Sequence, residues 1–193
     1  SFYATPSGGE AAFVGLDNYR TVLADPDWAA TFWNSFWNNM KFFAVHMLIQ
    51  NPIGIALAGI LSLPRLRFRN SYRTMMIMPT MLSVAIVGFI WQFILSPVWG
   101  VGADLLDIIG LKSLFGPWLG KEGSALITLS FISVWQWVGI PLMLIYAALL
   151  AIPDDLVDAA VVDGATHFEV FWHIKLPLVF PTVAMVSILT FVG

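Results

Sequence analysis

Long apolar stretches recur along the chain, and short polar segments separate them. A helix needs about 20 mainly apolar residues to cross the hydrocarbon core of a bilayer. Three stretches reach that length, and a fourth begins near Leu176 and stays apolar to the last residue. The pattern predicts spans over about 36–63, 75–95, 125–150 and 176–193. We therefore expect an all-α integral membrane protein, a polytopic transmembrane helix bundle.

The composition supports this fold class. Hydrophobic residues make up 59% of the 193 positions and charged residues 11%, against about 25% charged in ordinary soluble domains. A soluble bundle of buried helices is the alternative, but three such lengths are hard to bury in a chain of this size. The absence of cysteine excludes disulfides and thiolate sites. The chain starts at Ser1 and stops inside an apolar run, so we expect it to be a fragment.

The arginines predict the orientation. Arg65, Arg67, Arg69 and Arg73 lie between the first two predicted spans, where there is no acidic residue. Basic residues gather in the cytoplasmic loops of membrane proteins. This loop is therefore expected inside, which makes residues 1–35 an extracytoplasmic segment and places the loop 151–175 in the cytoplasm. Residues 36–193 form the predicted transmembrane domain.

The loop between the third and fourth spans has its own local signals. Pro153 suits a first helical position and precedes two acidic residues, which favour a helix start. Gly164 fits the left-handed stop that ends many helices. Thr166 and Glu169 have the spacing of a capping box, which starts a second helix. We predict a short helix, a tight turn and a second short helix at the cytoplasmic surface.

One segment carries a specific resemblance. It runs Asp158-Ala159-Ala160-Val161-Val162-Asp163-Gly164-Ala165 and is followed by Phe171, Ile174, Leu176-Pro177 and Pro181. This pattern resembles the cytoplasmic signature loop of permeases in binding-protein-dependent importers of the ATP-binding-cassette superfamily. Asp158 stands where the family usually has Glu. The stretch 13–19, Phe-Val-Gly-Leu-Asp-Asn-Tyr, resembles the start of permeases for sugars and polyols.

The resemblance implies a fold, a role and partners. The four spans would be the second to fifth of six core spans in a multi-pass protein of the bacterial inner (cytoplasmic) membrane. The loop would be a coupling element docked on cytoplasmic ATPase subunits. Further partners would be a second permease subunit, an extracytoplasmic solute-binding protein and membrane lipid. ATP and Mg would bind in the ATPase, so this chain would be no enzyme and hold no cofactor. The coupling residues would be Asp158, Ala159, Ala160, Asp163, Gly164 and Ala165. An amphipathic helix that only lies on lipid is the alternative.

Polar residues inside the spans are candidates for a substrate path. Such residues usually face a bundle interior or a water-filled cavity. The resemblance implies contacts near Ser133, Gln136 and Trp137 on the third span and near Thr190 on the fourth. Amide and indole groups suit a sugar, through hydrogen bonds and stacking. For each residue, hydrogen bonding between helices is the structural alternative.

Other functions find less support in the sequence. His167 and His173 do not share a helix face, which disfavours a metal site. Residues 116–121 resemble a phosphate loop only faintly. A catalytic constellation and a basic, aromatic surface for nucleic acid are both missing. The remaining alternatives are an importer for a polyamine, peptide or phosphate, an ion-gradient symporter and a membrane-embedded enzyme.

Overall fold

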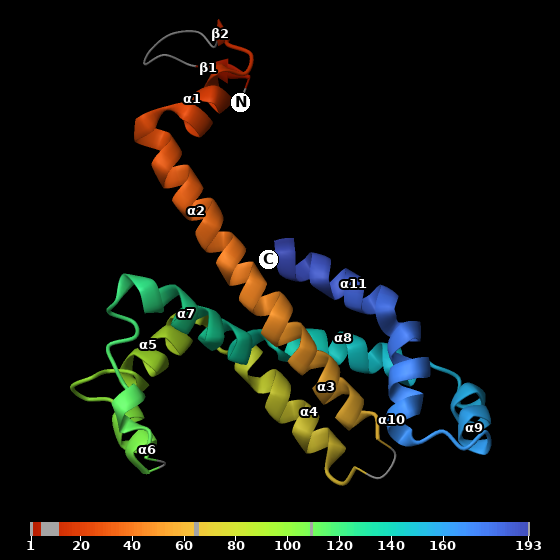
Figure 1. Ribbon diagram of the computed structural model, residues 1–193. Coiled ribbons are helices and arrows are strands. Elements are labelled where there is room, and N and C mark those ends of the chain that lie inside the picture. Colours follow the sequence, from red (N-terminus) through yellow and green to blue (C-terminus); the bar gives the residue numbers. More distant parts are fainter. Residues whose placement is uncertain (1, 5–11, 64–65, 109, 193) are drawn as a thin grey trace. The chain divides into compact units, whose positions relative to one another are not determined.

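The computed structural model describes residues 2–4, 12–63, 66–108 and 110–192. The chain divides into two compact units, Ser1–Phe42 and Phe43–Gly193. Figure 1 shows that helices dominate both units. Arg65, one of the four arginines used for the orientation, lies outside the described residues.

The first unit joins a small strand pair to helices. Strands β1 (Tyr3–Ala4) and β2 (Ala12–Phe13) pair antiparallel, with Tyr3 opposite Phe13. Helix α1 (Asp17–Ala24) follows, and the amide of Asn18 donates to the carbonyl of Tyr3 at 3.1 Å. This bond joins the stretch 13–19, which resembles the start of sugar and polyol permeases, to the strand pair.

The first span is a longer helix than the sequence predicts. Helix α2 (Pro26–Val45), a π-helical turn η1 (His46–Gln50) and α3 (Asn51–Leu61) follow one another. Together they form one apolar helix of 36 residues, long enough to cross a membrane. It begins at Pro26 and not near residue 36, because the carboxylate of Asp25 accepts the N–H of Asp27 at 2.9 Å and proline suits the first helical position.

The second predicted span is broken. Helix α4 (Arg69–Ile77) runs into a 3₁₀ turn η2 (Met78–Met81), and α5 (Val84–Ile94) leaves it at an angle of 98°. One continuous helix over 75–95 is therefore wrong. Pro79 cannot donate a backbone hydrogen bond, and the hydroxyl of Ser83 accepts the N–H of Ile86 at 3.3 Å, which caps a new helix.

The third span is bent and the fourth is one helix. After α6 (Gly102–Ile108) and a 3₁₀ turn η3 (Lys112–Leu114), helices α7 (Glu122–Trp137) and α8 (Gly139–Leu150) meet at 42°. The bend lies at Val138, about one turn before Pro141, and proline is a common cause of helix kinks. Helix α9 (Asp154–Val162), α10 (His167–Val170), a π-helical turn η4 (Phe171–Lys175) and α11 (Leu176–Val192) complete the chain. Residues 167–192 form an apolar helix of 26 residues.

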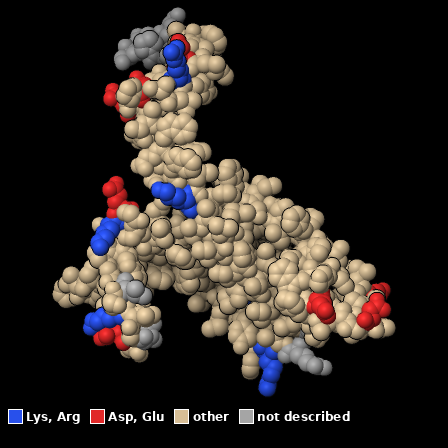
Figure 2. All heavy atoms as spheres, in the orientation of Figure 1, with Lys and Arg blue, Asp and Glu red and all other residues tan. Residues whose placement is uncertain are grey.

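The core of the second unit joins three helices. Buried apolar side chains from α3, α8 and α11 form one cluster, namely Ala58, Leu61, Leu142, Ile145, Tyr146, Leu149, Val179 and Val186. Glycines bring helices close, as is common in membranes. A Cβ built on Gly54 would lie 3.3 Å from the backbone nitrogen of Leu142. Charged residues are absent from 74–103, 123–153 and 176–192, and Figure 2 shows acidic side chains gathered over the α9 end of this unit.

Candidate functional site

The segment after α8 has the predicted helix-turn-helix form. Helix α9 ends in a Schellman motif, where Ala165 N–H donates to the carbonyl of Ala160 at 2.9 Å and Gly164 N–H to that of Val161 at 3.0 Å. Gly164 has a φ of +87°, as predicted for a left-handed stop. Pro153 differs slightly from the expectation, because it is the N-cap residue and α9 starts at Asp154.

The second helix starts at the predicted capping box. The hydroxyl of Thr166 accepts the N–H of Glu169 at 3.3 Å, and the Glu169 carboxylate accepts the N–H of Thr166 at 2.8 Å. These two bonds satisfy donors that a helix start otherwise leaves free. A glycine stop and a capping box therefore fix both ends of the turn between α9 and α10, and α9 has a defined direction.

Helix α9 presents nearly all of its surface to the outside of the described unit. None of its residues is buried, and the side chain of Val162 is 86% exposed. Asp158, Ala159 and Asp163 are exposed as well. The helix combines apolar side chains, small alanines and carboxylates on an open surface, which suits contact with another molecule more than chemistry.

The predicted path residues make hydrogen bonds to different parts of the chain. The hydroxyl of Ser133 on α7 hydrogen-bonds the Nε2 of His46 in η1 at 3.1 Å. Gln136, only 3% exposed, donates from Nε2 to the carbonyl of Leu82 at 3.0 Å. Trp137 is 37% exposed. Thr190 donates to the carbonyl of Val186 at 2.9 Å, so its hydrogen bond stays within α11.

Two polar contacts escaped the sequence reasoning. Leu82, whose carbonyl receives Gln136, lies in the broken part of the second span, between η2 and α5. Breaks of this kind in membrane helices are tolerated where the backbone is buried in protein or lines a cavity. The amide of Asn51 donates to the hydroxyl of Ser187 at 3.4 Å, which links α3 to α11. The proline and serine around the break were the available signals for the first contact.

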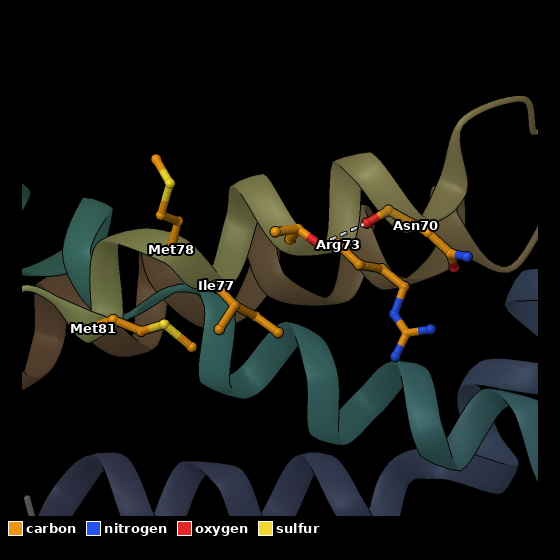
Figure 3. A pocket seen from close by; sticks show the side chains of 6 residues that line it. Asn70, Arg73, Ile77, Met78 and Met81 are labelled. Carbon is orange, nitrogen blue, oxygen red and sulfur yellow. Dashed lines mark hydrogen bonds between the residues drawn. The ribbon is translucent and has the colours of Figure 1, made fainter.

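A pocket lies beside this break. It has a volume of about 470 Å³ and is lined by Asn70, Arg73, Thr74, Ile77, Met78 and Met81. Figure 3 shows that the Asn70 and Arg73 end is polar and that Ile77, Met78 and Met81 form the apolar end. The guanidinium of Arg73 lies 5.2 Å from the ring centre of Tyr146 on α8, a cation–π arrangement. The pocket thus has a charged end and an apolar end on one broken span.

The long apolar helices, the broken span and the exposed helix-turn-helix together are features of a polytopic membrane protein. Residues 50–193 match the family described as "Binding-protein-dependent transport system inner membrane component". Because the match covers most of the chain, the chain belongs to this family. The matched residues include the broken second span, the bent third span and the whole α9–α10 segment.

Known proteins agree with this assignment. The chain is 33% identical over 169 residues to the probable ABC transporter permease protein YurN of Bacillus subtilis (strain 168), covering 87% of this chain and 56% of that protein. It is 30% identical over 187 residues to the arabinooligosaccharides transport system permease protein AraP of the same organism, covering 96% and 57%. The chain therefore spans a little over half the length of these relatives.

A solved structure has the same fold. It is the crystal structure of a bacterial ABC transporter involved in the import of the acidic polysaccharide alginate, with a TM-score of 0.78 and 25% identity. The match covers 91% of this chain and 60% of that chain. The predicted all-α, importer-permease fold class is confirmed.

Proposed function

We propose that the chain is part of the membrane-spanning permease subunit of an ATP-driven importer in a bacterial inner membrane. Its cargo would be a sugar, oligosaccharide or polyol, taken from an extracytoplasmic solute-binding protein. A second permease subunit would complete the path, and cytoplasmic ATPase subunits would bind ATP and Mg. The names of the matched relatives, which include an arabinooligosaccharide permease and an alginate importer, support this cargo class.

The exposure of α9 is the observation that carries the coupling role. This helix is held at both ends by backbone hydrogen bonds but has no buried residue. Ala159 lies exposed on it and Ala160 half-buried, so a partner could approach the helix closely. We propose that Asp158, Ala159, Ala160, Asp163, Gly164 and Ala165 seat in a cleft of the ATPase and transmit its closure to the spans.

Substitution of the small residue tests the coupling role. Ala159→Trp should reduce co-purification of the ATPase with the full-length permease, or leave ATP hydrolysis without transport. Ala30→Trp is the matched control, because Ala30 is also an exposed alanine on a helix but lies near the start of α2, at the end of that helix opposite the predicted cytoplasmic loop. An Ala159→Trp complex with normal assembly and transport would contradict the coupling role.

The path for the cargo would pass the broken second span and the middle of α7. Gln136 reaches the broken backbone, and Trp137 offers a partly exposed indole one residue away. Ser133 and Thr190 would contribute hydroxyls. Uptake of labelled arabinotriose, maltose and glycerol 3-phosphate, with spermidine as the non-sugar comparison, tests the cargo class. Uptake of spermidine alone would overturn the sugar assignment.

A further inference from the structure

Gly59 lies in unusually close contact with an aromatic ring of the helix-turn-helix segment. It is near the end of α3, two residues before Leu61. A Cβ built on Gly59 would lie 2.8 Å from Cε2 and 3.0 Å from Cζ of Phe171. Real Cβ atoms essentially never approach another atom this closely. The ring therefore occupies the space that any other residue at position 59 would need.

Phe171 lies where it can influence the direction of α9. It opens the π-helical turn η4, directly after α10, and its ring packs against the core cluster of α3, α8 and α11. The preceding Val170 is only 2% exposed. Because the capping box and the Schellman motif join α9 to α10, the place where Phe171 sits on α3 helps to set the direction of α9.

A cavity lies beside this contact and has room for a displaced Phe171 ring. It has a volume of about 330 Å³. Its walls include Gly59 and Ile60 of α3, Val157 of α9, and Phe168 and Phe171 of the following segment. A side chain at position 59 would push the far end of the Phe171 ring toward this space. The fold would survive this substitution, because alanine stabilises a helix by about 1 kcal/mol relative to glycine.

We propose that Gly59 is a positioning residue for the coupling segment. By having no side chain, it lets Phe171 lodge against α3, and this contact sets the angle at which α9 meets its partner. The contact also links the segment to α3 of the first span, in addition to its covalent links to α8 and α11. The consequence for ATP hydrolysis rests on the coupling role proposed above, whereas the positioning itself does not.

A distance measurement on the full-length permease in lipid nanodiscs tests the positioning. Spin labels on cysteines replacing Met75 of α4 and Asp154 of α9, both exposed, report the place of α9. Gly59→Ala should shift or broaden the distance distribution, and Gly59→Ala with Phe171→Leu should restore it. Gly88→Ala is the matched control, because a Cβ there would meet nothing within 4 Å. An unchanged distribution in Gly59→Ala, or no restoration by Phe171→Leu, would overturn the proposal.

The effect on coupling is measured in the same variants. In the complex purified with its ATPase, Gly59→Ala should change the rate of MgATP hydrolysis by about fivefold or more, and the double variant should return toward the original rate. A shifted distance with an unchanged rate would refute the effect on coupling. Failure of any ATPase to co-purify with the unaltered permease would count against the proposed function, while the distance measurement would still decide the positioning role.

Discussion

A close contact between helices in the second unit lies at Gly139, where the bend of the third span meets α4. A Cβ built there would lie 2.5 Å from the carbonyl oxygen of Met76 and 3.2 Å from Cα of Ile77. These are backbone atoms, which cannot rotate away as the end of a side chain can. To bring the closest contact from 2.5 Å to the 3.0 Å limit, α4 and the bend must separate by at least about 0.5 Å.

Three Gly→Ala variants turn this geometry into a graded series. Alanine favours a helix similarly at each site, so differences between the variants report packing. Gly88→Ala introduces no contact, and Gly54→Ala introduces contacts of 3.3 Å. Gly139→Ala should be less stable than Gly88→Ala by about 1–3 kcal/mol, the usual cost of overpacking, and Gly54→Ala should lie between them.

The assay is unfolding of the purified full-length permease in mixed micelles, followed by far-ultraviolet circular dichroism as the denaturing detergent is increased. The free energies of unfolding should rank Gly88→Ala above Gly54→Ala above Gly139→Ala. Equal values within about 0.5 kcal/mol, the scatter typical of substitutions at open sites, would refute the close approach of α4 to the bend. A reversed order would refute it as well.

Three further predictions concern the candidate site and the orientation. Gly164→Val should lower the stability of the protein by about 1 kcal/mol and reduce co-purification of the ATPase. Gly164→Asn should lower the stability less, because asparagine tolerates positive φ. Equal effects of the two substitutions would argue against a left-handed conformation at position 164. Gln136→Ala and Trp137→Ala should reduce transport in vesicles without loss of membrane insertion, and normal uptake by both would assign these residues to packing alone. A cysteine replacing Ser71 should react with an impermeant maleimide only from the cytoplasm, and one replacing Ser113 only from outside; the opposite labelling would invert the orientation.

Local signals made the helix-turn-helix segment predictable. Gly164, Thr166 and Glu169 each act within a few residues of their own position, through a left-handed stop and a capping box. The order of neighbouring residues therefore contains what is needed to predict these elements. The apolar lengths also predicted helical stretches that, among the described residues, are long enough to cross a membrane, two as single helices and two as bent pairs.

The break in the second span could not be read from hydropathy. Residues 75–95 stay apolar across it, and proline alone is often tolerated in membrane helices. Pro79 and Ser83 are local signals of the break, but the hydrogen bond that supports its backbone is non-local, because Gln136 donates to the carbonyl of Leu82 from 54 residues away. The contact of Gly59 with Phe171 could not be predicted for the same reason, because the two residues lie far apart in the sequence. Gln136 is recognisable in the sequence as a polar residue within a span, but its partner Leu82 is not.

The π-helical turn His46–Gln50 has a consequence for chain length. Its last bond runs from the N–H of Asn51 to the carbonyl of His46, so the turn contains one residue more than an α-helical turn. Deletion of one residue there, such as the exposed Leu48, would close the wide turn to an α-helical one and leave the residues before it in the same phase relative to α3. Phe43 would keep its contact with the ring of Phe191, and His46 its hydrogen bond to Ser133. The wide turn thus absorbs one residue without changing the phase between two halves of one helix, whereas a deletion in its α-helical part would rotate the residues before it by about 100°.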